Sequence, residues 1–155
     1  MREAVIVSTA RTGLAKSFRG GFNDTEAPAM GGHVVRAAIA RAGIDPAEVD
    51  DCIFGAAAQQ GTQAYNIGRL CGIAGGLPDT VAGVQVNRFC ASGLEAVNIA
   101  AQKVGSGFED LVFADDIIDE QQIRGQRVHF IGGERSFAVQ GHRAIDVVPD
   151  RRRER

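Results

Sequence analysis

Short apolar runs alternate with longer amphipathic stretches through the first 114 residues of the chain. The runs are short, rich in β-branched residues and bounded by turn-forming residues, which is typical of buried strands. They occupy residues 4–8, 49–54, 81–86 and 111–114. The intervening stretches carry apolar residues at helical spacing, and three of them predict helices. These helices are expected over residues 25–43, 66–74 and 91–104.

Glycines and polar residues predict where the helices begin and end. Asp24 or Thr25 could cap the first helix, which we expect to end at Gly43. The second helix is expected to stop at Gly75-Gly76. Strands that alternate with helices favour a parallel or mixed sheet covered on both faces. Residues 1–114 are therefore predicted to form an α/β layered domain of the α/β/α kind.

The character of the sequence changes after residue 114. The first 114 residues contain 20 charged side chains, whereas the last 41 contain 16, and the alanine-rich helical patterns disappear. We interpret residues 115–155 as a non-homologous charged tail, with disorder as an open alternative. Within it, Asp115, Asp116, Asp119 and Glu120 lack the spacing of an EF-hand, which favours a solvated acidic patch over a cation site.

Charge and cysteine content exclude several classes of protein. The formal net charge is −2, so nothing global points to nucleic acid or to an anionic membrane. No apolar run is long enough for a signal peptide or a membrane span. Cys52, Cys71 and Cys90 form no CxxC pair, which argues against a zinc site and a disulfide framework. Reduced thiols and a cytoplasmic location, with no metal and no membrane or nucleic-acid partner, are the expectation.

The most informative stretch is VNRFCASGLEAV, residues 86–97, which places Cys90 where a strand gives way to a helix. Unpaired N–H groups and the helix dipole favour negative charge there, and hence the reactive thiolate form of a cysteine. The backbone of Ala91, Ser92 and Gly93 could also stabilise an oxyanion. The alternative is that Cys90, like Cys52 and Cys71, is a small buried apolar residue.

This stretch is very similar to the nucleophile motif of the thiolases, in which a cysteine preceded by Val-Asn opens a buried helix. The similarity continues through VIVSTARTGLAKSFRGGF, ARAGIDPAEVDDCIFG, QAYNIGRLCGIAGGLPDTV and QKVGSGFEDLVFA, and so covers nearly all of residues 1–114. The neighbourhood of Phe89 resembles the degradative 3-ketoacyl-CoA thiolases. The resemblance implies a thiolase-like layered domain that is incomplete in this chain, with Cys90 as nucleophile.

The resemblance also implies a reaction and its partners. Cys90 would attack the 3-keto group of an acyl-CoA, and coenzyme A would then take the acyl group, or the reverse condensation would run. Coenzyme A is thus expected as a substrate, and no bound cofactor is expected. A homodimer or tetramer is expected if the fold is complete. Asn66, Arg69, Asn87 and Arg88 fall in stretches that thiolases place at the active-site rim or the subunit interface; a polar helix face is the alternative for Asn66 and Arg69.

The sequence departs from the family after Ala114, where Asp115-Asp116-Ile117 replaces the usual Gly-Gly and acidic motif. The family's second half supplies a Gly-His-Pro histidine and a Cys-x-Gly cysteine, and neither motif occurs here. His142 follows a glycine but precedes Arg143, and His33 has no metal-spaced partner. The main hypothesis is therefore a thiolase with impaired activity, and two alternatives to it remain open. One is a non-catalytic truncated fragment or dimerisation module, and the other is a ketoacyl-synthase-type condensing enzyme.

Overall fold

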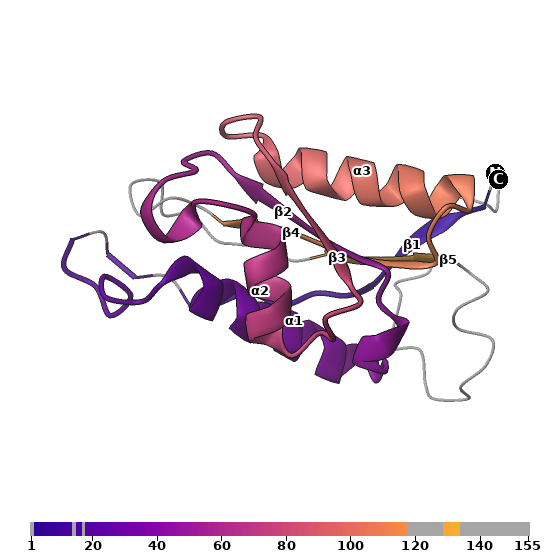
Figure 1. Cartoon of the computed structure of the whole chain (residues 1–155), viewed down its shortest axis with the longest axis horizontal. Coiled ribbons are helices and arrows are strands. Elements are labelled where there is room, and N and C mark those ends of the chain that lie inside the picture. Colours follow the sequence, from indigo (N-terminus) through magenta and orange to yellow (C-terminus); the bar gives the residue numbers. More distant parts are fainter. Residues whose placement is uncertain (1, 14, 17, 118–128, 134–155) are drawn as a thin grey trace, which may run out of the picture.

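The protein is described by a computed structural model that covers residues 2–13, 15–16, 18–117 and 129–133. The strands are β1 (Ala4–Ser8), β2 (Asp51–Ala56), β3 (Ala82–Val86), β4 (Leu111–Ile117) and β5 (His129–Gly133). They form one mixed sheet in the order β1-β5-β4-β2-β3 (Figure 1). β2 pairs in parallel with β3 and β4, whereas β5 runs antiparallel to both β1 and β4.

Helices cover both faces of this sheet, as the alternating pattern predicts. α1 (Ala27–Ala42) and α2 (Ile67–Gly75) pack together on one face, and α3 (Ser92–Ser106) lies on the other (Figure 1). Two short 3-10 helices, Pro46–Glu48 and Gly61–Gln63, lie in the connections. The layered α/β/α architecture expected for residues 1–114 is thus confirmed, and the sheet is mixed because β5, from beyond residue 114, runs antiparallel to its neighbours.

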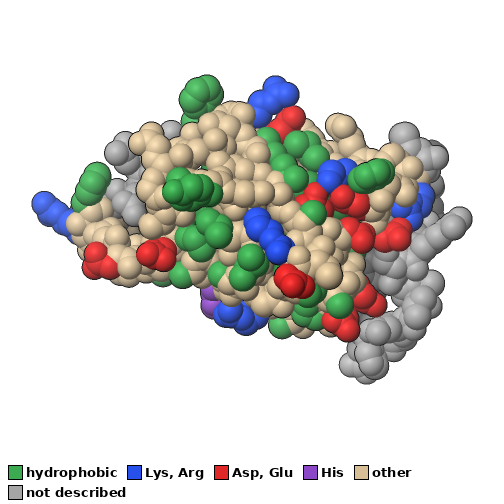
Figure 2. Space-filling model, in the orientation of Figure 1, with side chains coloured by type: hydrophobic (Ala, Val, Ile, Leu, Met, Phe, Trp, Pro, Cys, Tyr) green, Lys and Arg blue, Asp and Glu red, His purple; other side chains and the backbone are tan. Residues whose placement is uncertain are grey.

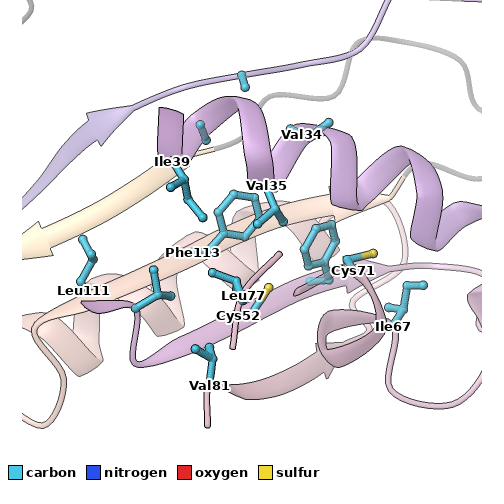
Figure 3. Packing of buried hydrophobic residues seen from close by; sticks show 14 of the residues in the cluster. Val34, Val35, Ile39, Cys52, Ile67, Cys71, Leu77, Val81, Leu111 and Phe113 are labelled. Carbon is cyan, nitrogen blue, oxygen red and sulfur yellow. The ribbon is translucent and has the colours of Figure 1, made fainter. Parts of the chain in front are cut away.

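The pleat of β2 divides the core between the two faces. Cys52 and Phe54 point to the side of α1 and α2, where Phe54 stacks on Phe113 of β4 with ring centroids 5.4 Å apart. Figure 3 shows Cys52 and Cys71 within this cluster, among aliphatic side chains from α1 and β4. Ile53 points to the opposite side and joins the smaller cluster under α3. This second cluster holds α3, and therefore the residues at its start, against the sheet.

The C-terminal end of α3 is held by charged groups. Lys103 Nζ lies 2.5 Å from Asp51 Oδ2 and 2.7 Å from Glu109 Oε1, and Asp51 is buried. Burial lowers the pKa of Lys103, but the hydrogen bonds and charges of Asp51 and Glu109 outweigh it and raise the pKa overall. Lys103 therefore keeps its charge and ties the last turns of α3 to the start of β2.

The bounds of several elements differ from the prediction, most clearly those of α1 and β2. α1 begins at Ala27 after Glu26, which makes no side-chain capping hydrogen bond, so neither Asp24 nor Thr25 caps it. A proline in the first turn, where its missing N–H costs nothing, fixes this start instead. The predicted end at Gly43 is confirmed, with φ at 66°. β2 also continues to Ala56 rather than stopping before Gly55.

Part of the predicted tail belongs to the sheet. β4 extends to Ile117, and β5 lies between β1 and β4 with four paired residues on each side. Residues 129–133 therefore pair in the sheet, while residues 118–128 and 134–155 lie outside the described residues. The interpretation of residues 115–155 as a non-homologous charged tail stays a prediction. Asp115 is 1% exposed, which corrects the expectation that it belongs to a solvated acidic patch. Within the described ranges, no helix is long and apolar enough to span a membrane.

Candidate active site

Cys90 lies in the short turn that joins β3 to α3, two residues before the helix begins. Its side chain is exposed, which rules out the alternative of a buried packing cysteine. The residue before it, Phe89, has a left-handed backbone with φ at 49°. β3 is an edge strand and runs parallel to β2. The carboxyl ends of these two parallel strands therefore form the edge at which Cys90 is presented.

Gly55 of β2 brings the start of α3 close to the sheet. A Cβ placed on Gly55 would lie 2.5 Å from the carbonyl carbon of Ser92 and 2.6 Å from the backbone nitrogen of Gly93. These are backbone atoms of the first helical turn, so they cannot move aside as a flexible side chain would. The absence of a side chain at Gly55 thus sets how closely the Cys90 turn approaches β2.

The other two thiols are in a different chemical environment. Cys52 and Cys71 are fully buried in the core. Burial raises the pKa of the Cys52 thiol well above its ordinary value, and the neighbouring Cys71 and Asp51 raise it further. Burial likewise raises the pKa of Cys71, with a smaller contribution from Asp115. Both are core thiols, as the sequence predicts, and both are held in the unreactive protonated form.

Cys90 is expected to react at least about tenfold faster with iodoacetamide than Cys52 or Cys71 at neutral pH. The reason is that only Cys90 is exposed, whereas the other two can react only when the core opens and their raised pKa values fall. Peptide mapping by mass spectrometry after timed quenching measures the three rates. Faster labelling of Cys52 or Cys71 in the folded chain would contradict this placement of the three thiols.

The residues predicted to supply oxyanion donors lie directly beside Cys90. The N–H of Ala91 donates to the carbonyl of Arg88 at 3.1 Å, and the N–H of Ser92 donates to that of Phe89, also at 3.1 Å. These two groups are thus engaged within the turn itself. Gly93 lies in the first turn of α3 and is half-buried. A role in oxyanion stabilisation stays a prediction for all three residues, and the engaged N–H groups of Ala91 and Ser92 count against it.

The structure gives Asn66 and Arg69 roles in packing. Asn66 caps α2 by accepting a hydrogen bond from the N–H of Arg69 at 3.1 Å, and its amide donates to the carbonyl of Gly83 in β3 at 2.7 Å. The Arg69 guanidinium donates to the carbonyls of Val81 and Asp79. Both residues therefore connect α2 to the edge strand, and their place at a rim or an interface stays a prediction.

Asn87 and Arg88 are brought together with Cys90, since they precede it in the same turn. The Asn87 amide spans from the turn to β2: its Oδ1 accepts from the N–H of Phe89 at 2.9 Å, and its Nδ2 donates to the carbonyl of Ala57 at 3.2 Å. Arg88 is exposed and pairs with Glu95 of α3 at 3.2 Å. An exposed pair of this kind contributes little to stability.

No metal centre is indicated in the part of the chain that the structure describes. That part contains no group of three or more His, Cys, Asp or Glu side chains that could hold an ion. His33 is exposed on α1, in agreement with a surface histidine. His142 lies outside the described residues, as do Asp119 and Glu120. Among the described residues, the exposed thiol of Cys90 is the nucleophilic cysteine at this edge of the sheet.

Comparison with known families decides what kind of domain carries this thiol. The sequence model described as "Thiolase, N-terminal domain" matches residues 4–115 of the chain. The chain belongs to the thiolase family. Its α/β layers are therefore those of a thiolase N-terminal domain. The role of Cys90 as nucleophile stays a prediction.

Thiolases from two bacteria are among its relatives. The chain is 41% identical over 110 residues to a 3-ketoacyl-CoA thiolase of Acinetobacter baumannii strain ATCC 17978. The matched residues make up 71% of this chain and 28% of that protein. It is 39% identical over 114 residues to a 3-ketoacyl-CoA thiolase of Bacillus subtilis strain 168, covering 74% of this chain and 29% of that protein. The chain thus spans less than a third of the length of these thiolases.

A solved thiolase has the same fold. The Acat5 thiolase from Ascaris suum, whose crystal structure is in complex with coenzyme A, superposes with a TM-score of 0.70 at 28% sequence identity. The match covers 74% of this chain and 30% of the Ascaris chain. The agreement in fold is therefore confined to one part of the larger thiolase.

Several residues that shape the site were not found by sequence reasoning. The role of Gly55 could have been recognised from the sequence, because a glycine inside a buried strand often marks the close approach of another backbone. Gln85 of β3 accepts from the N–H of Ile67 at 2.8 Å and so orients the start of α2, but its type and spacing gave no hint of this. The left-handed conformation of Phe89 also carried no signal, because an aromatic residue rarely adopts it.

Proposed function

We propose that this chain carries out the acyl-accepting step of a thiolase, with Cys90 as the nucleophile. The observation that carries the proposal is an exposed cysteine in the strand-to-helix turn of a thiolase N-terminal domain. The other two thiols are buried and held protonated, so they do not compete for this role. Coenzyme A thioesters are the proposed substrates, supported by the Ascaris thiolase that was crystallised with coenzyme A.

The proposed chemistry proceeds in two half-reactions. The Cys90 thiolate attacks the 3-keto carbon of a 3-ketoacyl-CoA and forms a tetrahedral alkoxide. Collapse of the alkoxide breaks the bond between C2 and C3, which leaves the acyl group on sulfur and releases the enolate of acetyl-CoA, and this enolate takes up a proton. The thiol of a second coenzyme A then attacks the acyl-cysteine, which frees Cys90 and yields the shortened acyl-CoA.

The reverse direction would use the same intermediate. Acetyl-CoA would transfer its acetyl group to Cys90 and release coenzyme A, and the enolate of a second acetyl-CoA would attack the acetyl-cysteine. The first of these steps requires only a thiol, an acyl-CoA and a proton acceptor. It is therefore the step most accessible to this chain, and a cytoplasmic location with no bound cofactor is part of the same proposal.

Release of coenzyme A from acetyl-CoA tests the proposal. We expect the wild-type chain to release about one coenzyme A per chain and then stop, because each Cys90 holds its acetyl group. Chromatographic quantification of coenzyme A over time measures this, with Cys90→Ala as the negative control and Cys52→Ala as the matched control that should behave like wild type. Equal release from wild type and Cys90→Ala would reject the proposal.

A second candidate is a non-catalytic dimerisation module, and the sheet edge supports it. Among the strands that the structure describes, β3 pairs on one side only, with β2. Two exposed apolar side chains, Leu70 and Ile73, lie on the neighbouring helix α2. Figure 2 shows hydrophobic side chains standing out at several places on one face of the molecule. Light scattering after size exclusion tests this candidate. A dimer that is dissociated by Ile73→Asp, at an exposed position of α2, supports it, whereas a monomer at all concentrations rejects it. The relatives given above are all thiolases, which gives no support to a ketoacyl synthase.

A further inference from the structure

The Ser92 side chain closes the turn that carries Cys90. Ser92 is the first residue of α3 and is fully buried, although the residues just before it are exposed. Its Oγ accepts a hydrogen bond from the N–H of Arg88 at 3.0 Å and donates one to the carbonyl of Phe89 at 2.6 Å. One hydroxyl thus joins the two residues before Cys90 to the start of the helix after it.

Asn87 fixes the same turn from the other end. Its Oδ1 accepts from the N–H of Phe89 at 2.9 Å, while its Nδ2 reaches the carbonyl of Ala57, just beyond β2. The N–H of Phe89 is therefore held by Asn87, and the carbonyl of Phe89 is held by Ser92. Both backbone polar groups of the residue before Cys90 are engaged by side chains that are themselves anchored to the sheet and to α3.

Phe89 needs such support because its backbone is strained. Its φ of 49° lies in the left-handed region, which an aromatic residue rarely occupies. Its side chain is 76% exposed, so packing of the ring contributes little to holding this conformation. The side-chain hydrogen bonds from Asn87 and Ser92 therefore add to the backbone hydrogen bonds of the turn in fixing the peptide planes on either side of Phe89. These planes set the position of the Cα and Cβ atoms of Cys90.

We propose that Ser92 and Asn87 are positioning residues for the nucleophile: they hold Phe89 in its left-handed conformation and thereby aim the Cys90 thiol at the acyl carbon. This inference rests on the proposed function, because it concerns acyl transfer to Cys90. Attack on a thioester carbon requires a defined approach, and a displacement of about 1 Å can cost a hundredfold in rate. Alkylation by a small, freely diffusing reagent has no such requirement.

The test compares acyl transfer with alkylation in the full chain. Ser92→Ala is expected to slow acetylation of Cys90 by acetyl-CoA about tenfold or more, while the rate of its reaction with iodoacetamide changes less than about threefold. The double variant Ser92→Ala, Phe89→Gly should be acetylated at least about threefold faster than Ser92→Ala alone, because glycine adopts positive φ without strain. This rescue separates a positioning role from a general loss of packing.

Protection of Cys52 and Cys71 from iodoacetamide reports that each variant is folded. Unchanged acetylation in a protected Ser92→Ala variant would overturn the inference, as would equal losses in acetylation and alkylation. If Ser92→Ala exposes the buried thiols, Asn87→Ala is the variant that tests the inference. The Asn87 side chain is exposed, and its removal should also slow acetylation without slowing alkylation. Unchanged acetylation there overturns the inference. A wild-type chain that is not acetylated at all would instead reject the proposed function.

Discussion

The isolated 155-residue chain is expected to show no detectable thiolysis of acetoacetyl-CoA, even when it is folded. A full turnover needs a nucleophile, a base that activates it, an oxyanion site and a second acid or base. The chain offers Cys90 as nucleophile, but its sequence contains neither the Gly-His-Pro nor the Cys-x-Gly motif that thiolases use for the acid and base roles. Each such proton-transfer role contributes on the order of a hundred- to ten-thousandfold.

A thiolysis assay on the purified chain at neutral pH measures this, with Cys90→Ala as control. The expected result is a rate indistinguishable from that of Cys90→Ala. Turnover well above background that disappears in Cys90→Ala would contradict the prediction. It would mean that groups within residues 115–155 take the acid and base roles.

Gly55→Ala is expected to destabilise the protein by about 2–3 kcal/mol and to disturb the Cys90 turn as well. The added methyl group would meet the backbone of Ser92 and Gly93 at 2.5–2.6 Å, so the first turn of α3 must move away from β2. This movement stretches the turn before it, which carries Cys90. Urea denaturation followed by circular dichroism measures the change in the free energy of unfolding.

Gly105→Ala is the matched control, because Gly105 lies in the same helix but an added Cβ there would come no closer than 3.6 Å to Arg2. It should leave stability unchanged or raise it by about 0.5–1 kcal/mol, since alanine is the better helix former. A Gly55→Ala variant as stable as Gly105→Ala would show that α3 is not held against the sheet at this point.

The elements that could be predicted are those determined by local sequence. Glycine at a helix end can adopt positive φ at little cost, which is why Gly43 marked the end of α1 correctly. β5 could not be predicted in the same way. Its five residues lie in a charged segment, and it is a strand because it pairs with β1 and β4, which are far from each other in the sequence. Pairing over such separations leaves little signal in the sequence around the strand.

The candidate site was predictable to a similar extent. The place of Cys90 followed from a strand-to-helix junction and from the thiolase motif, and the structure agrees with that junction. The roles of its neighbours did not follow. Ser92 stood out only as a candidate backbone oxyanion donor and Asn87 as a rim or interface residue, because their side-chain hydrogen bonds depend on the left-handed conformation of Phe89. Intrinsic backbone preference argues against that conformation, and tertiary contacts override it.

The most direct test of the central claim is to locate the acyl group after the chain has reacted with acetyl-CoA. Peptide mapping by mass spectrometry, with proteolysis at mildly acidic pH to preserve thioesters, assigns the added mass to one of the three cysteines. The account predicts acetyl on Cys90, none on the buried Cys52 and Cys71, and its removal when coenzyme A is added back. Acetyl on Cys52 or Cys71 instead of Cys90, or no acetyl on any cysteine of the folded chain, would contradict it.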